Sequence, residues 1–162
     1  MWGRFAAPHD RKTFERSKLD HSERERHSET VAMFRDLLRL RREDPVFRQQ
    51  KQGAVDGAVL SPDAFMLRYF GAEDDRLLIV NLGLDLHLDV APEPLLAPPE
   101  GQEWDVIWSS EAPLYGGCGV PQADTVENFY FPGHTTLVLK PAKRRRTAKE
   151  PPRTIDHPPK HD

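Results

Sequence analysis

Pairs of carboxylates are the residues of this sequence that most directly suggest chemistry. Two acidic side chains on opposite sides of a sugar bond are the usual machinery of glycoside hydrolysis. The pairs here are Asp74 with Asp75, Asp85 with Asp89, and Glu103 with Asp105. All of them fall in predicted turns or at alternating strand positions that face water. Catalytic acids need burial or a close like charge to raise the pKa, so we interpret these residues as surface carboxylates.

Histidine and cysteine do not form a recognisable metal or nucleophile motif. His157 and His161 are four residues apart, but in a proline-rich tail they would not share a helical face. The glycine-rich loop YGGCG at 115–119 lacks the Lys-Ser/Thr ending of a phosphate-binding loop and is typical of a tight turn. We therefore predict no catalytic, cofactor-binding or metal-binding residue, and no cofactor.

Three aromatic residues, Trp104, Trp108 and Tyr115, could form a platform on which a sugar ring stacks. The alternative is packing in the protein core, because Trp104 and Trp108 have the same parity on one predicted strand and should point the same way. Core packing is the favoured interpretation, and glucan contact is kept as a second possibility.

Charge is distributed unevenly along the 162 residues. The net charge of −3 comes from +2 over residues 1–44, −10 over 45–139 and +5 over 140–162. An acidic middle segment repels phosphate backbones and argues against nucleic acid as a partner. The single cysteine cannot form an internal disulfide, and no stretch has the length of a membrane span or the pattern of a signal peptide. We expect a cytoplasmic protein.

An amphipathic helix is predicted over residues 22–44. Ser22 and Glu25 have the spacing of a capping box, and Asp44-Pro45 should end the helix because proline disfavours the α conformation in the residue before it. An apolar stripe recurs at three- and four-residue steps. Its main members are Val31, Phe34, Leu37 and Leu38. If this face folds back onto the following domain, Leu38→Ala should cost about 2–5 kcal/mol, and if the helix projects the cost should be small.

Short apolar segments separated by Gly, Pro and Asp follow the helix, a pattern typical of β-strands. The expected strands are 53–60, 65–70, 77–82, 86–90, 104–109 and 135–139, with a possible seventh at 126–131. The polar segment 71–75 predicts a hairpin turn. Six or seven short strands favour an antiparallel β-sandwich over residues 46–141. The basic, proline-rich segment 142–162 is expected to be a disordered tail.

Five segments together resemble the C-terminal end of malto-oligosyltrehalose trehalohydrolases, which belong to the α-amylase superfamily, glycoside hydrolase family 13. They occur in the order and approximate spacing of that family and are TFERSKLDHSERERH, FRDLLRLRREDPVF, LLIVNLG, WSSEAPLYGGCG and FPGHTTLVLKP. The resemblance covers about residues 5–141. One departure is His21, where the family usually has tryptophan, so a packing contact with the barrel would be weakened.

The resemblance implies a division of the chain into functional parts. Residues 1–21 correspond to the segment after the last strand of a catalytic (β/α)₈ barrel, and residues 22–44 to the last barrel helix. Residues 46–141 correspond to the C-terminal β-sandwich. The catalytic residues of the family lie on barrel strands that no part of this sequence matches, so we expect no hydrolysis by this chain alone.

Three hypotheses about function follow. The chain is the C-terminal portion of a trehalose-releasing hydrolase, or an accessory subunit that docks onto a separately encoded barrel, or a module that binds α-glucan through Trp104, Trp108 or Tyr115. The stripe of Val31, Phe34, Leu37 and Leu38 is the expected contact with a barrel, with another partner or with a second copy of the chain.

Overall fold

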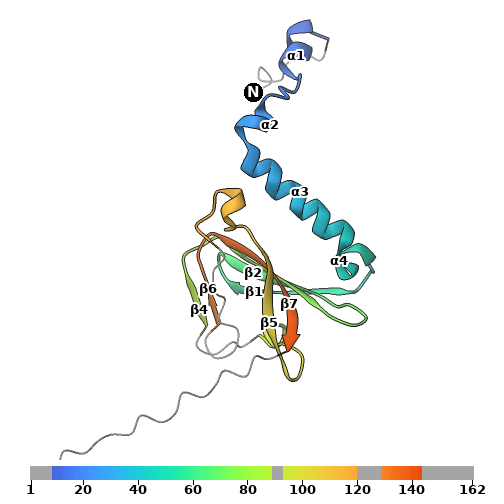
Figure 1. The fold of residues 1–162 in the computed structure, drawn as a ribbon, viewed down its shortest axis with the longest axis vertical. Coiled ribbons are helices and arrows are strands. Elements are labelled where there is room, and N and C mark those ends of the chain that lie inside the picture. The colour runs from blue at the N-terminus through green and yellow to red at the C-terminus, as the bar shows by residue number, and fades with distance from the viewer. Residues whose placement is uncertain (1–8, 89–92, 120–128, 144–162) are drawn as a thin grey trace, which may run out of the picture.

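The computed structural model describes residues 9–88, 93–119 and 129–143 and is drawn in Figure 1. Several features expected from the sequence fall outside these ranges. They are Asp89, His157, His161, the start of the possible strand 126–131, and the tail from residue 144. No helix within the described residues is long and apolar enough to cross a membrane.

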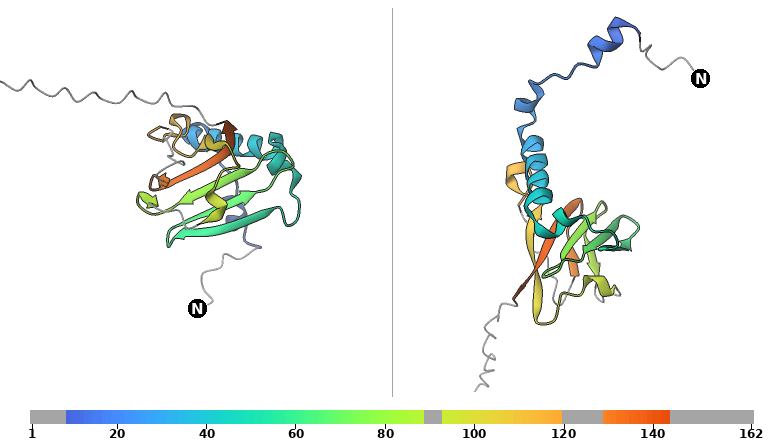
Figure 2. Two further views of the ribbon diagram at one scale, coloured as in Figure 1. Left: turned by 90° about the horizontal axis from the view of Figure 1, so that it is seen from below. Right: turned by 90° about the vertical axis from the view of Figure 1, so that its right-hand side faces the viewer.

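Four helices come first along the chain: α1 (Arg11–Arg16), α2 (Glu23–Arg26), α3 (Ser28–Glu43) and α4 (Pro45–Gln49). The first two contain no buried residue, and Figures 1 and 2 show them extending away from the rest of the molecule. The long helix α3 and the short α4 lie beside the β-domain instead. Helices α1 and α2 therefore have few contacts with the rest of the chain, whereas α3 and α4 lie against the β-domain.

The predicted capping box does not form. Ser22 has helical backbone angles and no side-chain bond to the helix; its hydroxyl donates to Asp20 Oδ1 at 2.7 Å instead. Two hydrogen bonds from Ser22 lower the pKa of Asp20. A local side-chain bond thus competes with the cap, and the predicted single helix is divided at His27, whose φ and ψ are −119° and 45°.

A second correction concerns Asp44-Pro45. Asp44 is extended, as expected before proline, and α3 ends there. The same residue then caps α4: its Oδ1 accepts from the backbone N–H groups of Val46 and Phe47 at 2.9 and 3.3 Å. Proline at the first position of a helix is compatible with this geometry. The chain therefore turns sharply into a second helix, where the sequence interpretation had only strands.

The β-domain is an antiparallel sandwich, as predicted. Its larger sheet has the order β1-β2-β3-β7-β5, and its smaller sheet pairs β4 with β6. The strands are β1 (Val55–Ser61), β2 (Ala64–Tyr69), β3 (Arg76–Asn81), β4 (Leu86–Leu88), β5 (Gln102–Ser109), β6 (Phe129–Phe131) and β7 (Thr135–Lys143). Two short 3₁₀ helices, η1 (Pro94–Leu96) and η2 (Pro113–Tyr115), complete the fold.

The predicted hairpin between β2 and β3 is confirmed, with Tyr69 paired to Arg76 across it. Asp75 closes the turn: Oδ1 accepts from the Gly71 N–H at 3.3 Å, and Oδ2 accepts from two nitrogens of Arg68 at 2.7 and 2.9 Å. A Cβ on Gly71 would collide with the Asp74 carbonyl oxygen. Asp75 is therefore a structural residue with little exposure, not the solvent-facing carboxylate that was predicted.

The core lies between the two sheets. Its buried cluster consists of Met66, Leu77, Ile79, Leu96, Trp104, Phe131, Leu137 and Leu139. Alternate residues of β2, β3 and β7 point into it, as the period of a strand requires. The other face of the larger sheet, which carries Leu78 and Val138, is partly covered by Leu37 and Leu40 of α3.

Candidate docking surface

The two sides of helix α3 have different surroundings: one faces the sheet and the other is exposed. Leu37 and Leu40 line a groove with Leu78 and Val138 of the sheet. On the helical wheel Leu38 lies about 160° and Phe34 about 120° from Leu40. Phe34 and Leu38 are 58% and 63% exposed. The predicted stripe is thus divided: Leu37 faces the groove beside the sandwich, while Phe34 and Leu38 face outward.

The outward residues form a continuous surface, here called the outer face of α3. Its lining residues are Arg24, Glu25, Ser28, Thr30, Val31, Phe34, Arg35 and Leu38, which border one shallow depression. Charged residues surround the apolar centre of Val31, Phe34 and Leu38. An apolar centre with a polar rim is the usual composition of a protein interface.

A buried ion pair fixes the C-terminal end of α3 and the start of α4 on the sheet. Arg76 Nε donates to Asp44 Oδ2 at 2.8 Å, and the two side chains are only 8% and 9% exposed. Asp44 is also the cap of α4, so one carboxylate holds both the helix and the strand. Phe47 of α4 packs edge-on against Tyr69, with ring centroids 4.9 Å apart.

A second connection fixes the middle of α3. The Tyr115 hydroxyl donates to Asp36 Oδ2 at 2.6 Å and accepts from Trp108 Nε1 at 3.1 Å. Asp36 also pairs with Arg39 at 2.9 Å. Burial, followed by the hydrogen bond to the Asp36 carboxylate, raises the pKa of Tyr115 above its usual value. These two connections hold α3 on the β-domain and fix the direction in which its outer face points.

The structure separates the three aromatic residues that the sequence grouped. Between Val106 and Trp108 the pairing of β5 with β7 shifts by one residue, so Ile107 is an inserted bulge residue. Trp104 consequently faces the core, where it is buried and its Nε1 donates to the Leu96 carbonyl at 2.7 Å. Trp108 pairs with Val138 and lies on the face covered by α3. The equal parity of Trp104 and Trp108 was therefore misleading.

This separation changes which aromatic residues could contact a sugar. The core position predicted for Trp104 is confirmed, and its burial removes it from the candidates for glucan contact. Trp108 and Tyr115 remain partly exposed, with ring centroids 6.0 Å apart and planes inclined by 34°. The packing partner of Trp108 is Tyr115, not the core.

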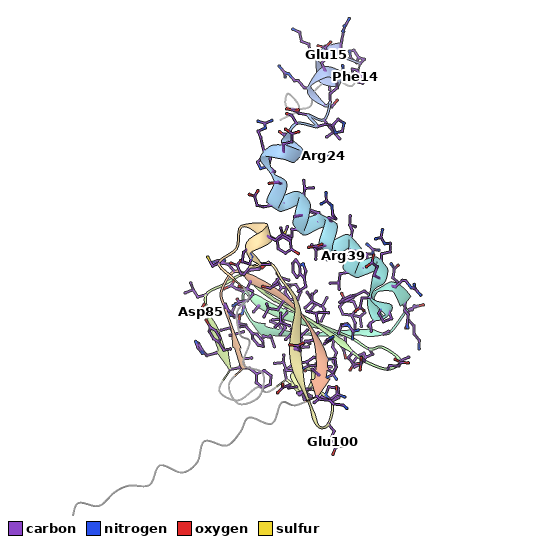
Figure 3. All side chains as sticks on the ribbon, in the orientation of Figure 1. Phe14, Glu15, Arg24, Arg39, Asp85 and Glu100 are labelled. Atoms are coloured by element: carbon purple, nitrogen blue, oxygen red, sulfur yellow. The ribbon has the colours of Figure 1, made fainter. Side chains whose placement is uncertain are left out.

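Asp85, one of the remaining acidic candidates, is bonded to residues in and beside the smaller sheet. Asp85 Oδ1 accepts from the Gly133 N–H at 2.8 Å and Oδ2 accepts from the Tyr130 hydroxyl at 3.1 Å, bonds that lower the pKa of Asp85. Figure 3 shows Asp85 near the smaller sheet, far from α3. Within the described residues, no group of three or more His, Cys, Asp or Glu side chains could hold a metal ion. The one free cysteine among these residues, Cys118, is exposed.

The comparisons with known proteins agree with the sequence motifs. Residues 52–127 match the family described as "Domain of unknown function (DUF3459)". The chain is 36% identical over 119 residues to malto-oligosyltrehalose trehalohydrolase of Deinococcus radiodurans, an alignment that covers 67% of this chain and 20% of that protein. The chain thus spans about a fifth of the length of this curated relative.

Solved structures give a more distant likeness. Two crystal structures of trehalose-6-phosphate hydrolase from Bacillus licheniformis each match with a TM-score of 0.48 and 18% identity. The matches cover 68% of this chain and 18% of each enzyme chain. The motifs, the family match and the trehalohydrolase alignment lead to one conclusion: the chain resembles the C-terminal region of malto-oligosyltrehalose trehalohydrolases of glycoside hydrolase family 13, and its residues 52–127 match the DUF3459 family.

Proposed function

We propose that this chain serves as the non-catalytic C-terminal part of a trehalohydrolase-like glycoside hydrolase. In this role α3 is the last helix of the catalytic (β/α)₈ barrel, and its outer face packs on the barrel. The barrel would cleave maltooligosyltrehalose and release trehalose, which would place the chain in trehalose formation from α-glucans. The same face would serve whether the barrel is covalently joined or a separately encoded subunit.

The observation that carries the proposal is the difference between the two sides of α3, one of which is bonded to the sandwich while the other is exposed. Asp36, Leu37, Leu40 and Asp44 are engaged by the sandwich, whereas Phe34 and Leu38 are more than half exposed. A helix stabilised only by its own sandwich would not need large apolar residues on its outer face. Their position, opposite the sandwich, is where a barrel would lie.

The sandwich has the properties of a support for that helix. The Asp44–Arg76 pair and the Tyr115–Asp36 bond join α3 and α4 to the β-domain at two places. Helices α3 and α4 and the described strands therefore form one folded unit, which is preceded by the exposed helices α1 and α2. This unit is what we expect to cap and stabilise the barrel.

An activity assay tests the proposal. The purified 162-residue chain should release no trehalose from maltooligosyltrehalose. When it is co-expressed with the Deinococcus radiodurans trehalohydrolase truncated by its C-terminal fifth, trehalose release and the melting temperature of the truncated enzyme should both rise. Trehalose release by the chain alone, or no effect on the truncated enzyme, would contradict the proposal. Exclusive formation of a symmetric dimer through α3 would favour self-association instead.

A further inference from the structure

A mixed polar and apolar groove lies between α3 and the end of β5, on a different side of the helix from its outer face. It has a volume of about 340 Å³, within the range of small-ligand sites. Its lining residues are Asp36, Arg39, Leu40, Glu43, Asp44, Ile107, Trp108 and Tyr115. Figure 3 marks Arg39 on α3. The groove shares no lining residue with the outer face, so a partner confined to that face would leave the groove open.

The aromatic wall of the groove is held in place before any ligand binds. Trp108 donates to Tyr115, and Tyr115 donates to Asp36, so both rings are fixed by hydrogen bonds. Fixed aromatic side chains contribute contact area at a low cost in conformational entropy. Their apolar faces suit the C–H surface of a sugar ring.

The rim of the groove supplies hydrogen-bonding groups from α3. Arg39 uses one terminal nitrogen for Asp36 at 2.9 Å, and its side chain is 61% exposed, so further N–H donors are open to a ligand. Glu43 is also largely exposed and bonds Arg42 through Oε1. A donor and an acceptor at the edge of an aromatic surface are complementary to the hydroxyl groups of a saccharide.

The charged residues that line the groove favour one class of saccharide over another. Three carboxylates line the groove, and each is paired with an arginine: Asp36 with Arg39, Glu43 with Arg42 and Asp44 with Arg76. With its lining charges balanced, the groove has no excess positive charge to attract phosphate or another anionic substituent, which favours a neutral sugar over a phosphorylated one.

We propose that the groove formed by Asp36, Arg39, Glu43, Trp108 and Tyr115 binds a short neutral α-1,4-glucan. The groove itself points to a neutral saccharide; the choice of an α-1,4-linked glucan rests on the proposed function. The site would hold glucan chains near the enzyme and takes no part in hydrolysis.

Nuclear magnetic resonance tests this inference, with the indole N–H resonance of Trp108 as the reporter. Titration of the full chain with maltoheptaose should shift this resonance saturably, while cellohexaose and trehalose 6-phosphate should not. Arg39→Ala and Glu43→Ala remove exposed rim groups and should each weaken binding by about tenfold, the factor that one hydrogen bond of ordinary strength gives. Arg11→Ala in α1 is the matched control and should leave affinity unchanged.

Four results would overturn the proposal: no saturable shift with maltoheptaose, equal binding of cellohexaose, preferential binding of trehalose 6-phosphate, or unaltered affinity in both rim variants. The assay is independent of barrel docking. A chain that binds maltoheptaose but ignores the truncated trehalohydrolase would support the groove and contradict the proposed function, and the reverse combination would do the opposite.

Discussion

The carboxylate of Asp44 accepts a 2.8 Å hydrogen bond from Arg76 Nε with one oxygen while its other oxygen caps α4. This residue stands at the boundary between the helical and β parts of the chain and binds to both. Since each side chain is less than a tenth exposed, the pair is held in a largely dry environment. Helix α3 is therefore part of the same folded unit as the sandwich.

Removing either partner of this pair should be costly. Arg76→Ala leaves a buried, uncompensated carboxylate, for which the expected loss in unfolding free energy is about 3–5 kcal/mol. Chemical denaturation of the variant measures this loss. The exposed pair Arg42–Glu43 is the control, because Arg42→Ala should cost less than about 1 kcal/mol. Equal losses of unfolding free energy in Arg76→Ala and Arg42→Ala would show that burial does not make the Asp44–Arg76 pair more important for stability than an exposed pair.

The hydroxyl of Tyr115 should contribute measurably to the attachment of α3. Tyr115→Phe keeps the ring but removes a donor to Asp36 and the acceptor of Trp108 Nε1. We expect a loss of about 1–2 kcal/mol in unfolding free energy, the range for a hydrogen bond to a charged group that is partly exposed. Urea denaturation followed by circular dichroism tests this. A change below about 0.3 kcal/mol would mean that the bond does not hold the helix.

The same bond gives a prediction for alkaline pH. The pKa of Tyr115 is raised in the folded protein, so its neutral form is favoured by folding. The contribution to stability is complete below the unfolded value, about pH 10, and is lost as the pH rises through the higher folded pKa. The stability difference between the wild type and Tyr115→Phe should therefore be constant below pH 10 and narrow above it. A difference that grows above pH 10 would contradict this.

The two sides of α3 should respond differently to truncation. Leu38→Ala should cost less than about 1 kcal/mol, since Leu38 is mostly exposed. Leu77→Ala, at a fully buried core position, should cost about 2–5 kcal/mol. Thermal denaturation of both variants measures the contrast. A large cost for Leu38→Ala would indicate that its side chain is buried in solution, by a partner or a second copy of the chain.

Gly71 should not tolerate a side chain. A Cβ at this position would meet the Asp74 carbonyl oxygen and the Val46 side chain, so Gly71→Ala should destabilise the β2–β3 turn by roughly 1–3 kcal/mol. Gly53→Ala is a control with open space around the added carbon, although its positive φ of 74° adds moderate strain. Denaturation should therefore rank Gly71→Ala as the more harmful change, and the reverse order would contradict the turn geometry.

The β-domain was the part of the fold that the sequence predicted well. The expected strands 65–70 and 77–82 differ by one residue at each end from β2 and β3, because alternating apolar residues between polar turns define strand positions directly. The bulge at Ile107 could not be predicted, since it depends on the pairing of β5 with β7. One inserted residue was enough to place Trp104 and Trp108 on opposite faces of the sheet.

The helical part was predicted less completely. The signal for α4 was present, because an Asp-Pro step can cap a new helix as readily as it ends the previous one. The contact side of α3 could not be read from its pattern. Leu37, Leu38 and Leu40 point in different directions around the helix, so apolar residues occur on both the fixed and the free side, and only the tertiary structure distinguishes Leu37 from Leu38.

The measurement that tests the central claim most directly is sedimentation velocity of the chain with the truncated trehalohydrolase. The wild type should form a one-to-one complex. Phe34→Asp, on the outer face of α3, should abolish it while leaving the circular dichroism spectrum unchanged. Leu84→Asp is the control, because Leu84 is 84% exposed and lies next to the smaller sheet; it should bind normally. Binding that survives Phe34→Asp, or that is lost equally in both variants, would contradict the role assigned to the outer face.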